Sequence, residues 1–244
     1  MLEGRPIDLN SDVGEAYGAW PGGPDDLLMP LLTSVNVACG YHAGDPSTIR
    51  HTCRASVDHG CVIGAQVSYP DLMGFGRRFL DMQPAELTDS VLYQLGALDA
   101  FAKVERARVL YVKPHGALYN AIVHHEAQAQ AVVEAVALFD ANLSVLGLPR
   151  SAVEDACHQA GLRFVAEGFA DRRYRPDGTL VPRTDPRALI TDPDAAGRQA
   201  LELAEWGVES ICVHSDTPGA VDIVRTVARM LVSDGYRLEA FALR

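Results

Sequence analysis

The sequence lacks the markers of several common protein classes. Basic residues are scarce, 21 against 32 acidic ones, and the resulting net charge of −11 repels nucleic acids and anionic membranes, so neither is expected as a partner. No run of apolar residues approaches the roughly 20 needed to span a bilayer. The N-terminal segment MLEGRPIDLN has no apolar core of signal-peptide length. We therefore expect a cytoplasmic protein.

Cysteine is also uncommon, and none of its five occurrences forms a CxxC pair. Cys39 and Cys212 lie within the apolar runs SVNVAC and SICV, which is typical of small buried side chains. Because most buried thiols are inert, we expect all five cysteines to be structural.

Signatures of nucleotide and metal sites are missing as well. No GxGxxG follows an expected strand, so a Rossmann dinucleotide site has no support, and neither a GxxxxGK[ST] loop nor a kinase signature occurs. The spacings HxxxH and HExxH, which would fix two metal ligands on one helix, are also missing. If the protein uses ATP, the nucleotide binds in an unfamiliar arrangement or on a partner subunit.

Short apolar runs alternate with longer amphipathic segments along the whole chain. Nearly continuous apolar runs are typical of parallel strands covered on both faces, and they predict strands at residues 7–10, 34–38, 62–66, 109–113, 143–147, 164–167 and 210–214. Helical spacing with Asp-Pro, Thr-Pro and glycine end signals predicts helices over residues 46–60, 84–106, 125–141, 150–161, 193–206 and 217–233. The tail, residues 237–243, is interpreted as a peripheral strand.

The seven strand–helix units follow one another without a Gly/Ser linker or a change in composition. This order indicates a single α/β domain over residues 1–244. Both a closed barrel and an open doubly wound sheet would satisfy the pattern, and we favour a barrel with fewer than eight strands.

Polar, glycine-bearing loops follow six of the seven expected strands. In a parallel α/β barrel the carboxyl ends of the strands share one rim, where catalytic residues gather. We expect acid–base catalysis from four residues at this rim: Asp12, His42, His115 and Asp216. We expect substrate contacts from six more: Asn10, Asp45, Arg78, Lys113, Glu167 and His214. Three histidines and one aspartate should line one common pocket: His42, His115, His214 and Asp12.

Two of these assignments have structural alternatives. Asp45 precedes Pro46 and can serve as a helix N-cap alone. Lys113 ends an apolar strand before Pro114, and we expect its ammonium group to contact an anionic substrate oxygen. The alternative is that its charge pairs with Asp12 or Glu167.

A metal site is a further alternative for the rim. Asp12, His42 and His115 would form a mixed nitrogen and oxygen ligand set. Without two ligands spaced on one helix, we do not expect a tightly bound structural metal there. Magnesium bound together with ATP is favoured, because it needs only one or two carboxylates besides the phosphate oxygens.

Long motifs in the six rim loops resemble the LamB/YcsF family, also called the PxpA family after the A subunit of 5-oxoprolinase. The resemblance runs from about residue 7 to residue 243, and no family motif is missing. The motifs are DLNSDVGEAYG (8–18), SVNVACGYHAGD (34–45), GAQVSYPDLMGFGRR (64–78), VKPHGALYN (112–120), EGFADRRYRPDGTLVPR (167–183) and HSDTPGA (214–220).

The resemblance implies a distorted (β/α)7 TIM-like barrel related to glycoside hydrolases and polysaccharide deacetylases. It also implies the ATP-dependent hydrolysis of 5-oxo-L-proline to L-glutamate, with ADP and phosphate as the other products. The B and C subunits of 5-oxoprolinase (PxpB and PxpC) are implied as partners.

The residue types suit this chemistry. A five-membered lactam is a stable amide, and phosphorylation of its oxygen would create a leaving group on the ring carbon. Water could then attack with the help of a general base, while cations such as Lys113 and Arg78 hold the carboxylate or phosphate. Two other readings remain open: a metal-dependent deacetylase or hydrolase without ATP, and a non-catalytic lactam-binding or regulatory subunit.

Overall fold

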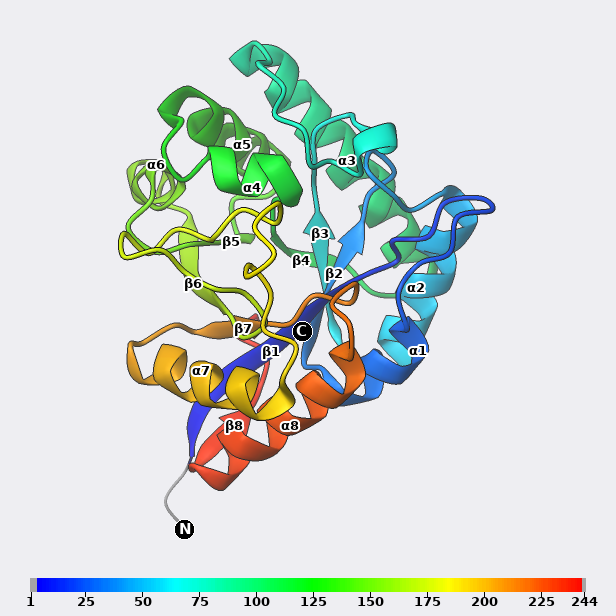
Figure 1. The fold of residues 1–244 in the computed structure, drawn as a ribbon. Coiled ribbons are helices and arrows are strands. Elements are labelled where there is room, and N and C mark those ends of the chain that lie inside the picture. Colours follow the sequence, from blue (N-terminus) through cyan, green and yellow to red (C-terminus); the bar gives the residue numbers. More distant parts are fainter. Residues whose placement is uncertain (1–3, 243–244) are drawn as a thin grey trace.

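Seven parallel strands close into a barrel in the computed structural model, which describes residues 4–242 (Figure 1). The strands follow each other around the barrel in sequence order, and β1 closes it by pairing with both β2 and β7. An eighth short strand pairs with the start of β1 outside the ring. The strands are β1 (Arg5–Val13), β2 (Ser34–Ala38), β3 (Val62–Gln66), β4 (Val109–Val112), β5 (Ser144–Gly147), β6 (Arg163–Phe169), β7 (Ser210–Cys212) and β8 (Tyr236–Leu238).

Helices surround the strands (Figure 1), and those predicted from residues 46, 84 and 193 begin at these residues. Asp45 caps α2 and Asp192 caps α7, each followed by proline at the first helical position. The helices are α1 (Asp25–Leu28), η1 (Met29–Leu31), α2 (Pro46–Asp58), η2 (Leu72–Gly74), α3 (Pro84–Val104), α4 (Gly116–Ala121), α5 (Glu126–Phe139), α6 (Ala152–Ala160), α7 (Pro193–Glu205) and α8 (Ala220–Ser233). None of those within the described residues is long and apolar enough to cross a membrane.

The predicted fold class, a distorted (β/α)7 TIM-like barrel, is therefore confirmed. All seven expected strands are present, and the predicted tail strand corresponds to β8, although position 243 lies outside the described residues. The last helix was expected from residue 217 but begins at Ala220. Gly219 adopts a left-handed φ of 80° there, and the Thr217 hydroxyl bonds to Asp171 instead of capping the helix.

Successive side chains of β1 point alternately to an apolar core outside the barrel and to a polar network inside it. Ile7, Leu9 and Val13 belong to the large apolar cluster between barrel and helices. Asp8 and Asn10 instead belong to a hydrogen-bonded network with side chains of other strands inside the barrel. Asn10 donates to Glu167 (3.0 Å) and Ser210 (2.7 Å), and Asp8 accepts from the hydroxyls of Thr33, Ser34 and Ser210. The barrel interior is thus polar, and the apolar core lies outside it.

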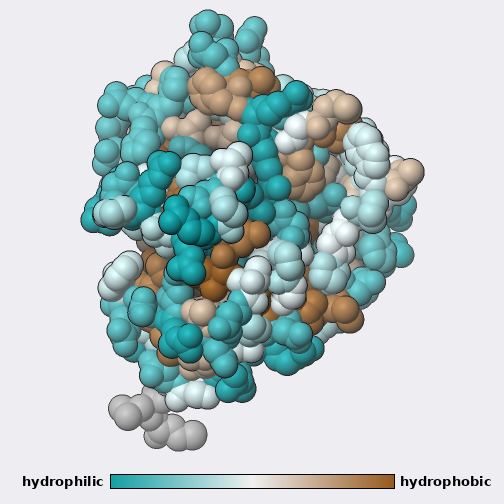
Figure 2. Space-filling model, in the orientation of Figure 1, coloured by the Kyte–Doolittle hydropathy of each residue, from teal (hydrophilic) through white to brown (hydrophobic). Residues whose placement is uncertain are grey.

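The outer surface is mostly hydrophilic in the face that Figure 2 shows, with apolar side chains in small separate patches. All five cysteines are buried, as the sequence predicted.

Candidate functional site

A cleft of about 710 Å³ opens at the carboxyl ends of the barrel strands. Its walls come from the ends of β1, β4, β6 and β7 and from the long segment between β6 and α7. Its lining includes Asp12, Arg77, Lys113, His115, Phe169, Arg172, Arg183 and His214. Catalytic residues of parallel α/β barrels lie at this end of the strands.

A larger cleft of about 820 Å³ lies at the opposite, amino-terminal ends of the strands, beside Asp8, Arg108 and Arg163. None of its described lining residues is a histidine. We place the functional site at the carboxyl rim, because of these two clefts that one alone combines, among the described residues, histidines with carboxylates and several arginines.

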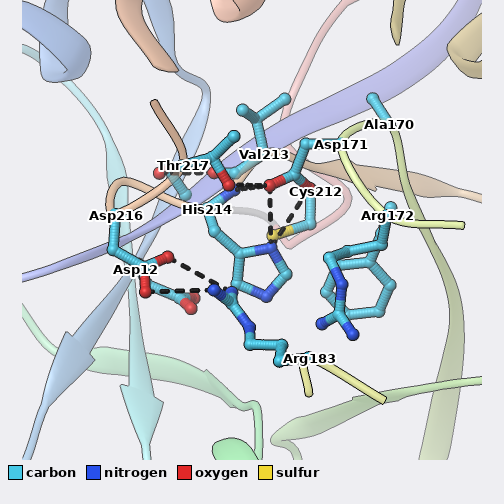
Figure 3. A network of polar contacts seen from close by, with 12 residues as sticks. Asp12, Ala170, Asp171, Arg172, Arg183, Cys212, Val213, His214, Asp216 and Thr217 are labelled. Carbon is cyan, nitrogen blue, oxygen red and sulfur yellow. Dashed lines mark hydrogen bonds and ion pairs between the residues drawn. The ribbon is translucent and has the colours of Figure 1, made fainter. Parts of the chain in front are cut away.

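His214 and Asp171 form a hydrogen-bonded pair at the rim (Figure 3). The His214 Nδ1 atom lies 3.1 Å from both carboxylate oxygens of Asp171, and the backbone N–H of His214 and the hydroxyl of Thr217 also donate to that carboxylate. Since a carboxylate accepts, Nδ1 carries the proton and Nε2 is left as the basic nitrogen. Burial by itself would raise the pKa of Asp171, but His214 and the bonds from His214 and Thr217 lower it overall. The arrangement suits a general base.

Three arginines lie along the same cleft with few carboxylates to neutralise them. Arg77 and Arg183 both pair with Asp216, at 2.5 and 3.1 Å (Figure 3 shows the second pair). Burial would raise the pKa of Asp216, but Arg183 and Arg77 lower it to about 2.

The third arginine, Arg172, is buried, and its Nη2 donates to the Val181 carbonyl at 2.7 Å. Its Nε has no hydrogen-bond partner in the part of the chain that the structure describes. Burial, together with the nearby Arg183, lowers the pKa of Arg172 to about 10, so the group is still charged at neutral pH. A buried guanidinium with an unused donor on a cleft wall is suited to bind an anion.

Lys113 lies among polar side chains of the barrel interior. Its Nζ lies 2.8 Å from Glu167 and 3.4 Å from Asp12, and all three side chains are buried. It also donates to Asn10 (3.2 Å). The two carboxylates of the polar interior hold the ammonium group, and its contact with a substrate oxygen stays a prediction. The ion-pair alternative is the one observed.

Two histidines from the loops after β2 and β4 stack beside the cleft. The rings of His42 and His115 are 3.9 Å apart and nearly parallel, and Phe75 meets both edge-on. Burial, followed by the proximity of His42 and Arg77, lowers the pKa of His115 well below its usual range. Glu15, rather than Asp12, is the carboxylate beside them, at 3.6 Å from each ring. The ligand-type atoms of Glu15, His42 and His115 all lie within 4.8 Å of one another.

The expected common pocket is confirmed for three of its four members. Asp12, His115 and His214 line the cleft, whereas His42 is buried and stacks on His115. Asp12 was the expected carboxylate partner of the two histidines, but it bonds to Asn36 (2.9 Å) and Lys113.

Four of the six expected substrate-binding residues do not line the cleft, and two of these, Asn10 and Glu167, are buried in the polar interior of the barrel. Asp45 accepts from the backbone of Ser47 (2.9 Å) and Thr48 (3.2 Å), the N-cap role noted as its alternative. Arg78 pairs with Asp71, and its side chain is 65 % exposed. Its neighbour Arg77 lines the cleft in its place.

Several residues of the site were not assigned from the sequence: Glu15, Gln66, Arg77, Asp171, Arg172 and Arg183. Four of them lie in the same rim loops as the assigned residues, and Gln66 ends β3, so a rule that counted every polar side chain after a strand would have included them. Arg183 lies in the long segment between β6 and α7, and no strand-end rule identifies it.

Comparison with known proteins gives consistent results. A profile of the LamB/YcsF family matches residues 7–243. The 5-oxoprolinase A subunit of Streptomyces avermitilis is 51% identical over 97% of this chain and 100% of its own length. That of Kocuria rhizophila is 52% identical over 97% and 99%.

Solved structures agree. A lactam utilization protein from Thermus thermophilus superposes with a TM-score of 0.91 at 40% identity, covering 97% of this chain and 100% of that one. A family 4 carbohydrate esterase from Streptomyces lividans, at 16% identity and a TM-score of 0.52, covers 96% of this chain and 91% of its own; it shares the fold alone.

Proposed function

The chain belongs to the LamB/YcsF family, and on that premise we propose that it is the A subunit of an ATP-hydrolysing 5-oxoprolinase. This enzyme opens the cyclic amide of 5-oxo-L-proline to give L-glutamate. The proposal rests on sequence identity with proteins named as A subunits of 5-oxoprolinase. About half of the residues are identical, over nearly the full length of both chains. The chemistry of the rim cleft is consistent with it.

Recognition of 5-oxoproline requires a cation for its carboxylate and a less polar wall for its ring. Arg172, with its unused Nε, and the adjacent Arg183 provide the cation. The ring of Phe169, which stacks on His214 at 5.0 Å, provides an apolar surface next to them. An arginine–carboxylate contact of this kind contributes on the order of 1.5–3 kcal/mol.

His214 is the proposed general base. With Nδ1–H held by Asp171, its Nε2 can accept a proton from the water that attacks the ring carbonyl carbon, and return it to the departing ring nitrogen. Asp171 keeps the imidazole in this tautomer and stabilises the imidazolium once it has formed.

Energy for the reaction comes from ATP, with Mg²⁺ as its companion ion, because an unactivated lactam is a stable amide. The complete reaction consumes one ATP and two waters and yields glutamate, ADP and phosphate. Since the relatives are named as A subunits, the proposed enzyme also contains the B and C subunits, and we place it in the cytoplasm. Arg77 and Arg183 are the candidates here to meet a phosphoryl group on the activated lactam.

Reconstitution tests this function. The purified chain, alone and mixed with the B and C subunits of its source organism, is assayed for glutamate formed from 5-oxoproline and ATP. We expect activity only in the complete mixture. Asp171→Asn in this chain should abolish the activity while the subunits still assemble into a complex. Full activity of B and C without this chain would contradict the proposal, as would ATP-independent hydrolysis of an acetylated sugar by this chain alone.

A further inference from the structure

Glu15, His42 and His115 converge from three of four consecutive strands of the barrel. They follow β1, β2 and β4, while Gln66, the last residue of β3, lies among them. Gln66 Nε2 is 3.0 Å from Glu15 Oε1 and 2.9 Å from His115 Nδ1, and Gln66 Oε1 is 3.1 Å from His42 Nε2. One amide therefore bridges three side chains that are all buried.

The spacing of these atoms matches a metal coordination shell. Glu15 Oε1 is 3.6 Å from His42 Nε2 and 3.6 Å from His115 Nδ1. A tetrahedral ion with bonds of about 2.0–2.1 Å holds its ligand atoms roughly 3.4 Å apart. Two of the ligand-atom distances are thus within a few tenths of an ångström of this value, and the two stacked rings, 11° from parallel, must tilt for both lone pairs to meet one ion.

The second nitrogen of His115 is arranged as in metal-bound histidines. Its Nε2 lies 3.0 Å from the carbonyl oxygen of Phe75, so Nε2 carries the proton and Nδ1 presents a lone pair to the cluster. His42 Nδ1 is buried and has no partner among the described residues. His42 therefore makes a hydrogen bond only through Nε2, the nitrogen that faces Glu15 and Gln66.

The loop over the two rings leaves them little freedom. Phe75 holds a left-handed φ of 54°, an unfavourable conformation for an aromatic residue. Gly76 also has a positive φ, and a Cβ there would lie 2.2 Å from Ser68 Oγ and 3.0 Å from both His42 and His115. Backbone strain and close packing of this kind are typical of sites whose geometry matters for binding or catalysis.

We propose that Glu15, His42 and His115 form a binding site for one divalent transition-metal ion at the wall of the rim cleft. Two imidazoles and one carboxylate suit zinc or cobalt, whereas magnesium and calcium prefer oxygen ligands alone. Gln66 bonds to the same atoms that would bind the ion, so its amide must turn aside. Because His115 lines the cleft, the remaining coordination position is within reach of a cleft ligand.

The sequence did not favour such a site because the spacing signals HxxxH and HExxH detect two ligands on one helix. Here the ligands come from three different loops, and only the closed barrel brings them together. Glu15 reaches the histidines because Gly14, with a φ of 69°, turns the chain away from the strand alternation that directs Asp12 to Lys113.

Titration with Co²⁺ after treatment with a chelator tests the site. The wild-type chain is expected to bind one equivalent with the strong visible absorption of a low-coordinate nitrogen and oxygen site. Glu15→Gln should weaken binding on the order of 100-fold or more. The matched control is His51→Gln, which removes an exposed histidine 3.9 Å from Asp26 and should leave the titration unchanged.

The Gln66→Ala variant provides a second, independent test of the metal site. Because it removes the amide that competes with the ion, binding should tighten by about tenfold. Loss of Co²⁺ binding in Gln66→Ala, retention of it in Glu15→Gln, or failure of the wild type to bind would each overturn the proposal. If Glu15→Gln does not fold, X-ray absorption of the wild type with Zn²⁺ decides, and a shell without two imidazoles overturns it. Neither readout uses 5-oxoproline turnover, so failure here leaves the proposed function standing.

Discussion

Replacing Lys113 by methionine is expected to destabilise the whole domain. The substitution keeps most of the apolar stem and removes the only cation that the structure places within 4.0 Å of Glu167 and Asp12 in the described part of the chain. Glu167 is completely buried, and one of its oxygens already has no hydrogen-bond partner there. The variant would therefore contain two carboxylates in the barrel without a counter-ion.

The magnitude follows from the burial of the pair. Removing one partner of a buried ion pair costs about 3–5 kcal/mol. In a domain of this size 1 kcal/mol shifts the melting temperature by about 2–4 °C, so Tm should fall by roughly 6–20 °C. Combining Lys113→Met with Glu167→Gln removes one of the stranded charges and should restore part of the loss.

Calorimetry of the purified chain at several pH values measures the effect. In the wild type, burial would raise the pKa of Asp12, but Lys113 lowers it overall, so this carboxylate stabilises the fold above its unfolded pKa. Without Lys113 the largest interaction that opposes burial is lost and the pKa of Asp12 rises, so acid relieves the stranded charge. The gap in Tm between variant and wild type should shrink from pH 8 to pH 5.

The control is Lys103→Met, which removes an exposed lysine paired with Asp99 one helical turn away at 2.6 Å. Such surface pairs contribute at most about 1 kcal/mol, so Tm should change by only a few degrees. A similarly small change in Lys113→Met, combined with lost turnover in the reconstituted enzyme, would refute the ion-pair reasoning and return Lys113 to a role in substrate binding.

Three further predictions concern other buried groups. Asp171→Asn should lower turnover by roughly 10³–10⁴-fold, because the amide no longer fixes Nδ1–H of His214; near-normal glutamate formation would exclude His214 as the base. Arg172→Met should raise KM for 5-oxoproline by about tenfold or more, with a smaller change in kcat, whereas an unchanged KM would place the substrate carboxylate elsewhere. Burial raises the pKa of Asp8 to about 6 from 3.8, so its ionisation costs roughly 3 kcal/mol of stability between pH 4 and 7. The wild type should lose Tm relative to Asp8→Asn over that range, and a constant difference would show that Asp8 titrates normally.

The sequence was informative about the position of the site and less so about the direction of its side chains. Parallel strands with covered faces produce apolar runs, and the loops after them must meet at one rim, so the barrel and the general location of the site could be predicted. Neighbouring residues in a loop, however, point in different directions. The sequence does not indicate that Arg77 faces the cleft whereas Arg78 pairs with Asp71.

Lys113 illustrates a different limit. Tyr111 on β4 and Lys113 directly after it share the inward face, and Tyr111 donates to Asn36 inside the barrel (2.8 Å). The alternation of side chains along a strand predicts that two residues share a face. It does not predict whether that face contacts water, apolar side chains or carboxylates. The carboxylate partners of Lys113 come from β1 and β6, more than 40 residues away in either direction.

The polar interior of the barrel also limits how the chain can assemble. A shift of β1 by one residue would turn Asp8, Asn10 and Asp12 toward the apolar layer beneath the helices and bring Leu9 among the carboxylates and amides. Such a misaligned strand would leave several buried polar groups unbonded, each at a cost of about 1–3 kcal/mol. A barrel lined with hydrocarbon tolerates small errors of alignment, whereas this one distinguishes sharply between the correct closure and a neighbouring one. Since β1 pairs with both β2 and β7, the closing contact of the first strand can form only after most of the chain has been synthesised.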